Sequence, residues 1–599
     1  MPRLYRRLIS IAVAIATVVG VVGVIPWPMP EGAFKADALR RMALTLGARE
    51  LQAGDIRLAL LPRPHITMSN VSFHQADKAA IFTIPAAQID LKLGPLLSGS
   101  AKPAGLSLTA PRIELTESPT SSSGFRYFSE RMIQSSEPLL NASPLNGLTR
   151  IAVDRGDISI RSLADGRIER YENVRLRLSL PHRDAPLSAS ASAVRNGEEI
   201  RFSFRGASPL AVANATLEKI DFSLWTPGIA VEFDGRGSLQ GKMTLAGNLV
   251  LRTGAKAPPP FMGALSKMGI ENLPPIELTG QLDFNDRGAN LPGLKVTLGK
   301  DRFEGAATLR HDGMRWNISS TLAGEKADLT ALFSPLSRMR RPDSSWNPAP
   351  VETDPLVAAN LDLRVSADAV TIHGLTFGKV ALAMHTRANR IEVTVPDATF
   401  GKGRGRLRLL ATTGADGMDV KLTGALDSGD LGQVLTAMTG AKRFSGMGSA
   451  QVAIDSSGRS MAEFVANADG RLSATLRDGS LQGIDLRRIA NRRPGKRPEV
   501  ALFESIGGET PFETASLTSK IVRGAATPVD GRMQAGRLVG TLTGTVDFAQ
   551  GLNSLVGSVV DIPSENYAAE PRPVIDFTVT GPLLDPTIKP NVSALLNRM

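Results

Sequence analysis

The chain has 599 residues, no cysteine and a formal net charge of +11. The lack of cysteine excludes disulfides, thiol catalysis and zinc–thiolate sites. A hydrophobic fraction of 42% with 21% charged residues argues against a disordered chain. Because the arginines are scattered and not clustered with aromatic residues, the basic surplus indicates solvated strand faces, or attraction to anionic lipid headgroups, and not nucleic acid.

Near the N-terminus, an apolar run of 18 residues without charge extends from Leu8 to Ile25. As a helix it would span about 27 Å, enough to cross a bilayer. Arg3, Arg6 and Arg7 precede it, which predicts a cytoplasmic N-terminus and an exported remainder. Pro26-Trp27-Pro28 follows in place of a small-residue cleavage site, so an uncleaved anchor is favoured over a signal peptide. The predicted anchor residues are Leu8, Ile11, Val13, Ile15, Val18, Val19, Val21, Val22, Val24 and Ile25.

Strand patterns dominate the chain after a predicted membrane-proximal helix at 32–46. Val174 to Leu180 is typical, because four aliphatic residues alternate with two arginines and a serine. Such alternation favours a mainly β fold: an extended, curved antiparallel sheet that forms a groove behind the transmembrane helix, with a few short helices. The clearest early strands are predicted at 51–61, 65–73, 84–93, 106–115, 151–160 and 174–180.

Segments rich in proline, serine or threonine interrupt this pattern at 116–148, 252–275, 335–355 and 563–573. Short helices are predicted at 428–439 and 459–466. We therefore predict an anchor at 1–30, an N-terminal β segment at 31–250, a middle β segment at 251–355 and a C-terminal β segment at 356–599.

No catalytic or metal-binding motif is visible. None of the six histidines stands at metal-ligand spacing. The glycine-rich stretch from Gly235 fails as a phosphate loop, because Met243 occupies the place of the magnesium-binding hydroxyl. Asp283 and Asp286 stand at turn positions, where aspartate is common. We expect a protein without catalytic residues, cofactor or metal, although a site built from distant residues stays open.

One face of the predicted sheet is apolar and needs a cover. The sequence leaves two alternatives for what covers this face: bound acyl chains, or the protein's own side chains. Val174, Leu176, Leu178 and Leu180 are expected to share one sheltered face. The full set of candidate groove-lining residues is Leu58, Leu60, Leu106, Leu108, Val174, Leu176, Leu178, Leu180, Ile391, Val393 and Val395.

Three segments resemble the AsmA family of Gram-negative envelope proteins. Residues 54–73 resemble the entry hairpin of that family, with a Pro62-Arg63-Pro64 corner. Residues 468–486, with Asp478-Gly479-Ser480 and Gly483-Ile484-Asp485, resemble its C-terminal signature, and residues 580–586 fit its closing segment.

The resemblance implies a periplasmic protein anchored in the inner membrane, a taco-shaped β-groove, and a role in phospholipid traffic or outer-membrane integrity. The expected partners are phospholipid and the inner membrane. An alternative is an assembly factor that offers an open sheet edge to outer-membrane β-proteins.

Overall fold

The computed structural model describes the chain in separate ranges and divides it into two compact units. The described residues are 25–28, 48–75, 80–98, 102–117, 148–162, 166–180, 182, 184–206, 208, 216–238, 243–254, 274–312, 315–331, 339–341, 345–351, 359–414, 417–440, 442–491, 506–562, 572–583 and 586–590. Unit 1 comprises residues 1–257 and 278–289, and unit 2 comprises residues 258–277 and 290–599. The predicted divisions at residues 30, 250 and 355 stay predictions.

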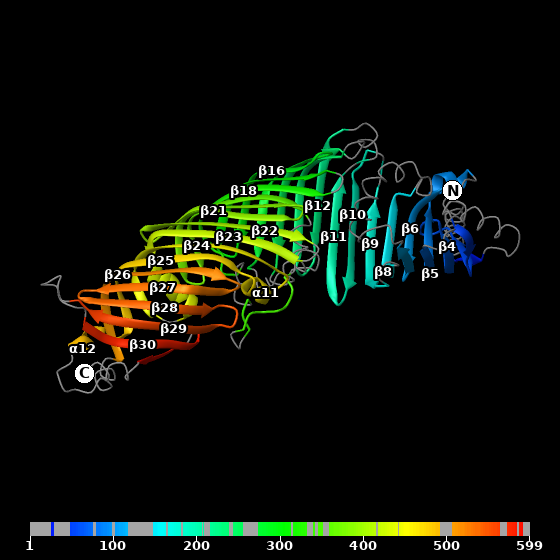
Figure 1. The fold of residues 1–599 in the computed structure, drawn as a ribbon. Coiled ribbons are helices and arrows are strands. Elements are labelled where there is room, and N and C mark those ends of the chain that lie inside the picture. Colours follow the sequence, from blue (N-terminus) through cyan, green and yellow to red (C-terminus); the bar gives the residue numbers. More distant parts are fainter. Residues whose placement is uncertain are drawn as a thin grey trace, which may run out of the picture. The chain divides into compact units, whose positions relative to one another are not determined.

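Unit 1 is a sheet of strands joined mainly by short turns, and β8 to β12 lie side by side within it (Figure 1). Its elements are β1 (Trp27–Pro28), β2 (Ala48–Gln52), β3 (Ile56–Ala59), β4 (His65–Gln75), β5 (Ala80–Leu91), α3 (Leu93–Leu97), β6 (Pro103–Thr109), β7 (Arg112–Glu117), β8 (Arg150–Ser162), β9 (Ile168–Ser179), β10 (Leu187–Arg195), β11 (Glu198–Gly206), β12 (Glu218–Trp225), β13 (Ile229–Ser238), β14 (Thr244–Thr253) and most of β15 (Ile276–Asn285).

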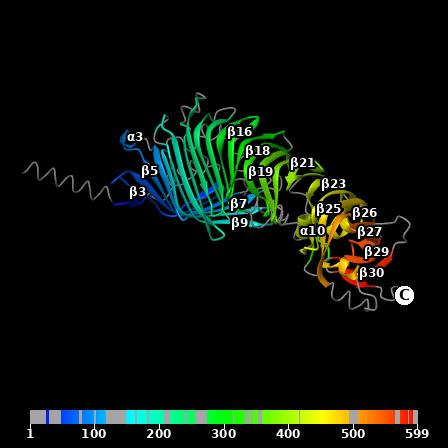
Figure 2. The ribbon, with the colours of Figure 1, turned by 90° about the vertical axis from the view of Figure 1, so that its left-hand side faces the viewer.

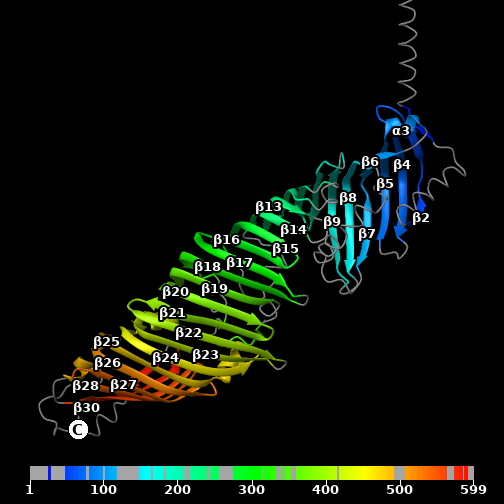
Figure 3. The same cartoon turned by 90° about the horizontal axis from the view of Figure 1, so that it is seen from above.

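Unit 2 is also built mainly of strands, and its strands β16 to β25 are stacked side by side in Figure 3. Its strands are most of β16 (Gly288–Leu298), β17 (Asp301–His311), β18 (Trp316–Asp328), β19 (Asn360–Ile372), β20 (Leu375–Arg387), β21 (Arg390–Phe400), β22 (Gly403–Gly414), β23 (Gly417–Asp430), β24 (Phe444–Gly458), β25 (Asp469–Ile484), β26 (Ile506–Val522), β27 (Ala525–Ala535), β28 (Leu538–Asp547), β29 (Leu552–Asp561), β30 (Arg572–Pro582) and β31 (Thr587–Pro590). Its helices are α10 (Leu431–Thr439), α11 (Met461–Ala466) and α12 (Leu486–Ala490).

The prediction of a mainly β fold with a few short helices is confirmed, and α10 and α11 fall where short helices were expected. Among the described residues, no helix is long and apolar enough to span a membrane. The predicted anchor from Leu8 to Val24 and the predicted helix at 32–46 lie outside the described residues. Ile25 alone of the anchor set is described, and it is exposed.

The pairing is antiparallel for most neighbours, but the expectation of an entirely antiparallel sheet is wrong. β8 pairs in parallel with β6 and β7, and β18 pairs in parallel with β19. A parallel pair needs a long connection that returns the chain to the same end of the sheet. The interruptions predicted around 116–148 and 335–355 lie between these strands, so their length matches this change of direction.

Several strands change the phase of their alternation at a single residue in the left-handed region. In β9 the inward-facing residues are odd-numbered before Asn173, whose φ is 51°, and even-numbered from Val174 onward. The neighbouring strand β8 shifts its alternation in the same way next to Arg155, whose φ is 53°. These are β-bulges, which add one residue to a strand and increase its twist. Other left-handed residues inside strands are Asn70, Lys379, Ser428 and Asp478.

Buried side chains gather in limited parts of each unit. In unit 1 a cluster of Ile56, Met68, Val71, Ile84 and Ala87 fills the space over β3, β4 and β5. In unit 2 the largest cluster lies toward the C-terminal strands. It comprises Leu431, Leu476, Leu486, Ile489, Phe512, Ala535, Leu538, Val559, Val574 and Ile575.

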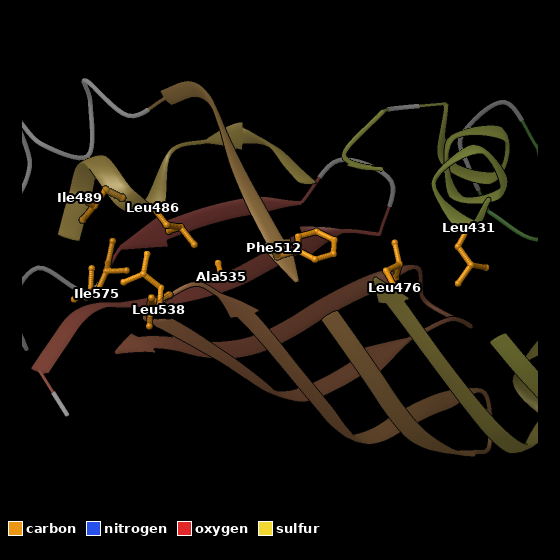
Figure 4. Close-up of a cluster of buried hydrophobic side chains, with 10 residues drawn as sticks. Leu431, Leu476, Leu486, Ile489, Phe512, Ala535, Leu538 and Ile575 are labelled. Carbon is orange, nitrogen blue, oxygen red and sulfur yellow. The ribbon is translucent and has the colours of Figure 1, made fainter. Parts of the chain in front are cut away.

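The helix α12 closes this C-terminal cluster. The Asp485 carboxylate accepts a hydrogen bond from the amide of Arg488 at 3.0 Å and caps the helix. The buried Thr510 hydroxyl accepts from the amide of Leu486 at 2.9 Å and donates to the carbonyl of Ile484 at 2.7 Å. Figure 4 shows Leu486 and Ile489 of α12 directed toward the strands that carry Leu538 and Ile575. This end of the sheet is therefore filled by its own side chains.

Two leucines on adjacent strands measure how much the cluster contributes. Leu538 is 4% exposed and Leu552 is 50% exposed. We expect Leu538→Ala to lower the free energy of unfolding of this region by about 2–5 kcal/mol, because it removes buried contacts and leaves a cavity. Leu552→Ala should cost under about 1 kcal/mol. Hydrogen exchange of the β28 and β29 amides measures both, and equal losses would contradict the assignment of the core.

Candidate functional site

The register of unit 1 aligns apolar residues in two continuous rows on one face of the sheet. Each row takes one residue from each of the strands β3, β4, β5, β6 and β8 to β14. The first apolar row is Leu58, Ile66, Ile89, Leu106, Ile151, Leu178, Ala189, Phe204, Phe222, Phe233 and Leu249. The second apolar row is Ile56, Met68, Ala87, Leu108, Val153, Leu176, Ala191, Phe202, Leu224, Val231 and Leu251. Neighbouring strands lie about 4.8 Å apart, so each row extends for roughly 50 Å.

Coverage of the rows changes along the sheet. Ile56, Met68 and Ala87 of the second row are buried, at the end where the unit 1 cluster lies. From β8 to β14, every member of both rows is only half-buried except Phe233, which is 6% exposed. We call the apolar face of β8 to β14 the open stretch. A sheet face packed against a second layer would bury these aliphatic and aromatic side chains.

Four phenylalanines form the centre of the open stretch, on the neighbouring strands β11, β12 and β13. Phe204 faces Phe222 across one strand pair, and Phe222 faces Phe233 across the next. Phe202 meets Phe222 edge to face, with ring centroids 5.6 Å apart. Gly235 makes room for this packing, since a Cβ there would lie 2.6 Å from the Phe233 ring. The result is a broad aromatic surface with large apolar area.

The opposite face of the same strands is polar. Arg177, Ser190, Ser203, Ser223 and Glu232 form one row across β9 to β13. Ion pairs also lie on this face.

Lys219 is one such group, with its ammonium 3.3 Å from the Asp221 carboxylate and 3.6 Å from that of Asp234. The hydrogen bond and charge of Asp221, supported by the charge of Asp234, raise the pKa of Lys219. The contrast between the two faces fixes which one meets water.

Unit 2 repeats the pattern in its middle strands. Leu363, Met384, Val393, Leu409, Leu422 and Ile454 form a half-buried apolar row across β19 to β24. Beside it, Leu407 is 40% exposed although it belongs to the apolar face. Its neighbour across the pair is Gly424, which offers no side chain to cover it. The middle of unit 2 is thus also incompletely covered.

The predicted lining residues fall in these rows to different extents. Leu58, Leu106, Leu108, Leu176 and Leu178 belong to the two apolar rows of unit 1. Val174 faces Gly156 at the bulge, and Leu180 lies half-buried just beyond β9.

The remaining predicted residues divide between the two units. In unit 2, Ile391 is buried, while Val393 and Val395 are half-buried. Leu60 lies beyond the end of β3 and is 42% exposed, so it belongs to neither row. The structure therefore brings Leu176 and Leu178 together with Leu106 and Leu108, but not with Leu60.

The aromatic centre was not among the predicted lining residues. Its signal was present in the sequence as Phe202 and Phe204 at alternate positions, and as Phe222 and Phe233 within two successive alternating runs. What the sequence did not supply was the register, which alone places these side chains opposite one another.

The described residues contain no group of three or more histidine, aspartate or glutamate side chains placed to hold a metal ion. A shallow cavity of about 410 Å³ lies in unit 2 and includes Lys402, Asp430 and Gln433 in its lining. Asp430 caps α10 by accepting a hydrogen bond from the Gln433 amide at 2.9 Å. Its carboxylate therefore has a structural role in this cavity.

The fold and the open stretch define a class of protein: a β-sheet protein that presents a long, incompletely covered apolar face. Residues 335–530 match the model of the AsmA family, in agreement with the resemblance seen in the sequence. The match contains the C-terminal signature at 468–486, which forms β25 and the start of α12. No curated protein and no solved structure matches the chain. Figure 2 gives a second view of the strands described here.

The lack of native cysteine allows a direct measurement of coverage. Val153 is half-buried in the open stretch, and Val71 is 4% exposed in the unit 1 cluster. We expect the thiol of Val153→Cys to react with a maleimide at least roughly tenfold faster than that of Val71→Cys, because thiol reactivity follows access to solvent. Equal rates in the ligand-free protein would contradict an open face.

Proposed function

We propose that this protein binds phospholipid and conducts it along its apolar face. The observation that carries the proposal is the open stretch, where two aligned rows of aliphatic and aromatic side chains, apart from Phe233, are only half-buried across seven consecutive strands. Large contiguous apolar patches are rare on soluble proteins and mark surfaces that bind an apolar partner.

The energetics favour acyl chains as that partner. Burial of a methylene group contributes about 0.8 kcal/mol, so one long acyl chain gains roughly 10 kcal/mol before the costs of ordering. The two apolar rows are parallel and separated by about 7 Å along each strand, a width that suits acyl chains lying across the strands. The polar face and the rims leave a charged headgroup in contact with water.

The filled parts of the molecule support a ligand over self-coverage. Where this chain covers an apolar face with its own side chains, it buries them, as at Ile56 and Val71 in unit 1 and at Leu538 and Val559 in unit 2. The open stretch lacks such burial although its residues are equally apolar. We therefore propose that a lipid covers it in the working protein.

The setting we propose is the bacterial envelope, with the predicted N-terminal segment as an inner-membrane anchor and the bulk of the chain in the periplasm. The AsmA match over residues 335–530 supports this setting. The role is then in phospholipid handling for the outer membrane, through binding and not through catalysis.

Capture of outer-membrane β-proteins at an open sheet edge is less favoured by the described strands. The terminal strand β31 is four residues long and contains Lys589 and Pro590. Short length, lysine and proline are features that protect an edge from further pairing. We therefore place the function on the face of the sheet and not on its edge.

A charge placed on the apolar face tests the proposal. Leu176→Arg should reduce the phospholipid retained by the purified chain by about tenfold or more, because a guanidinium in the path of the acyl chains must lose its hydration. Ser190→Arg is the matched control, since Ser190 lies on the adjacent strand with its side chain on the opposite, polar face. Lipid is extracted and quantified by mass spectrometry.

Two results would overturn the function. The first is a wild-type chain that contains no lipid and takes up no labelled phospholipid. The second is equal loss of lipid from Leu176→Arg and Ser190→Arg.

A further inference from the structure

A small charged cluster lies on the apolar side of unit 1, at the start of β9 and the end of β10. On the N-terminal side of the bulge at Asn173, Tyr171 faces Ile158 and Glu169 faces Ile160. Because Ile158 and Ile160 continue the inner face of β8, Tyr171 and Glu169 lie on that face as well. Arg195 is the last residue of β10 and continues the inward series of Ala191 and Ala193.

These three side chains contact one another. The Arg195 guanidinium lies 3.1 Å from one carboxylate oxygen of Glu169. The Tyr171 hydroxyl donates a hydrogen bond to the other oxygen at 3.1 Å. The guanidinium carbon lies 5.8 Å from the centroid of the Tyr171 ring. Burial raises the pKa of Tyr171, and the negative charge of Glu169 raises it further, so the phenol keeps its proton as a donor. We call these residues the rim cluster.

The rim cluster supplies accessible charges to the open stretch. Within the described inner faces of β8 to β14, the charged residues include Glu169, Arg195, Glu198 and Glu218. Glu198 is exposed and lies directly across from Arg195 in the β10–β11 pair. Glu218 is held by Ser208, whose amide and hydroxyl donate to its carboxylate at 2.6 and 2.7 Å. In contrast, the side chains of Arg195 and Glu169 are 36% and 47% exposed. The Arg195 cation therefore stands near the apolar rows with the Glu169 carboxylate in contact with it and the Glu198 carboxylate on the adjacent strand, within reach of a bound molecule.

We propose that the rim cluster binds the headgroup of a zwitterionic phospholipid whose acyl chains lie on the open stretch. Arg195 holds the phosphate, Glu169 holds the ammonium group, and the Tyr171 hydroxyl donates to a phosphate oxygen or to Glu169. This inference rests on the proposed lipid-binding function and assigns its headgroup class.

The charges and their chemistry support a zwitterion. A guanidinium forms paired hydrogen bonds with phosphate oxygens. A carboxylate next to it favours an ammonium and repels a second negative charge. An exposed ion pair contributes little to stability, so its exchange for two new pairs with the headgroup costs little. A headgroup with phosphate alone would leave Glu169 beside an anion, and an uncharged headgroup would use neither charge.

Competition among lipids with identical acyl chains tests the assignment. The full chain in detergent is offered phosphatidylethanolamine, phosphatidylglycerol and diacylglycerol, and the bound lipid is measured by mass spectrometry. We expect the wild type to prefer phosphatidylethanolamine over the other two by about tenfold. Arg195→Gln should abolish the preference over diacylglycerol, and Glu169→Gln should abolish the preference over phosphatidylglycerol. Diacylglycerol binding should be unchanged in both variants.

Arg177→Gln is the control, because Arg177 lies on the polar face of β9. It should keep the wild-type preference. Glycerophosphoethanolamine, the same headgroup without acyl chains, should compete weakly.

The outcomes separate the two proposals. Equal binding of all three lipids by the wild type, an unaltered preference in Arg195→Gln, or the same loss in Arg177→Gln would show that the cluster only pins β9 to β10, and would overturn the headgroup assignment alone. Strong competition by glycerophosphoethanolamine would show a site for a soluble phosphate compound and would overturn it too. A wild type that binds none of the lipids would overturn both this inference and the proposed function.

Discussion

The constraint on which both units depend is the cross-strand register. In a sheet with a period of two, a shift of one residue would exchange the apolar face for the polar one on every strand beyond it. Here the hydrogen-bonded pairs keep Leu178 opposite Ala189, Phe204 opposite Phe222, and so on through β14. A continuous apolar face exists because that phase is maintained from strand to strand.

This apolar face is covered in some parts of the molecule and left incompletely covered in others. Over β3 to β5 and over the C-terminal strands, the chain supplies its own cover and buries residues such as Met68 and Phe512. Over β8 to β14 and in the middle of unit 2 it does not. The segment 468–486, which resembles the AsmA family, contributes to the covered part of the face. Ser480 is buried with its hydroxyl 2.7 Å from that of Ser445, Asp485 caps α12, and Leu486 packs into the cluster. The segment that best resembles the family thus builds a closed end, whereas the candidate binding surface lies elsewhere.

Much of this was predictable from the amino-acid sequence. Alternation located most of the strands, but the strands predicted at 51–61 and 106–115 each divide in two, into β2 and β3 and into β6 and β7. The short helices α10 and α11 lie where short helices were predicted. The lining residues Leu106, Leu108, Leu176 and Leu178 were placed on the apolar face because each stands in an uninterrupted alternating run. The parallel pairs were missed because the direction of a strand depends on connections with no periodic pattern. Leu60, another candidate lining residue, lies outside the rows because the alternation of the sequence continues past Ala59, at which β3 ends.

Bulges set the remaining limit, and they have a consequence for how the sequence encodes this surface. A left-handed residue such as Asn173 shifts the two-residue alternation by one position. The residues of β9 that follow it therefore face the opposite side from the one that the earlier residues predict. Glu169 and Tyr171 face inward for this reason, while Arg175 and Arg177, beyond the shift, face outward. A one-residue insertion or deletion in such a strand would leave the two faces unchanged beyond it if a bulge were gained or lost at the same time. A sheet of this kind tolerates length changes in its strands while it preserves the chemistry of each side.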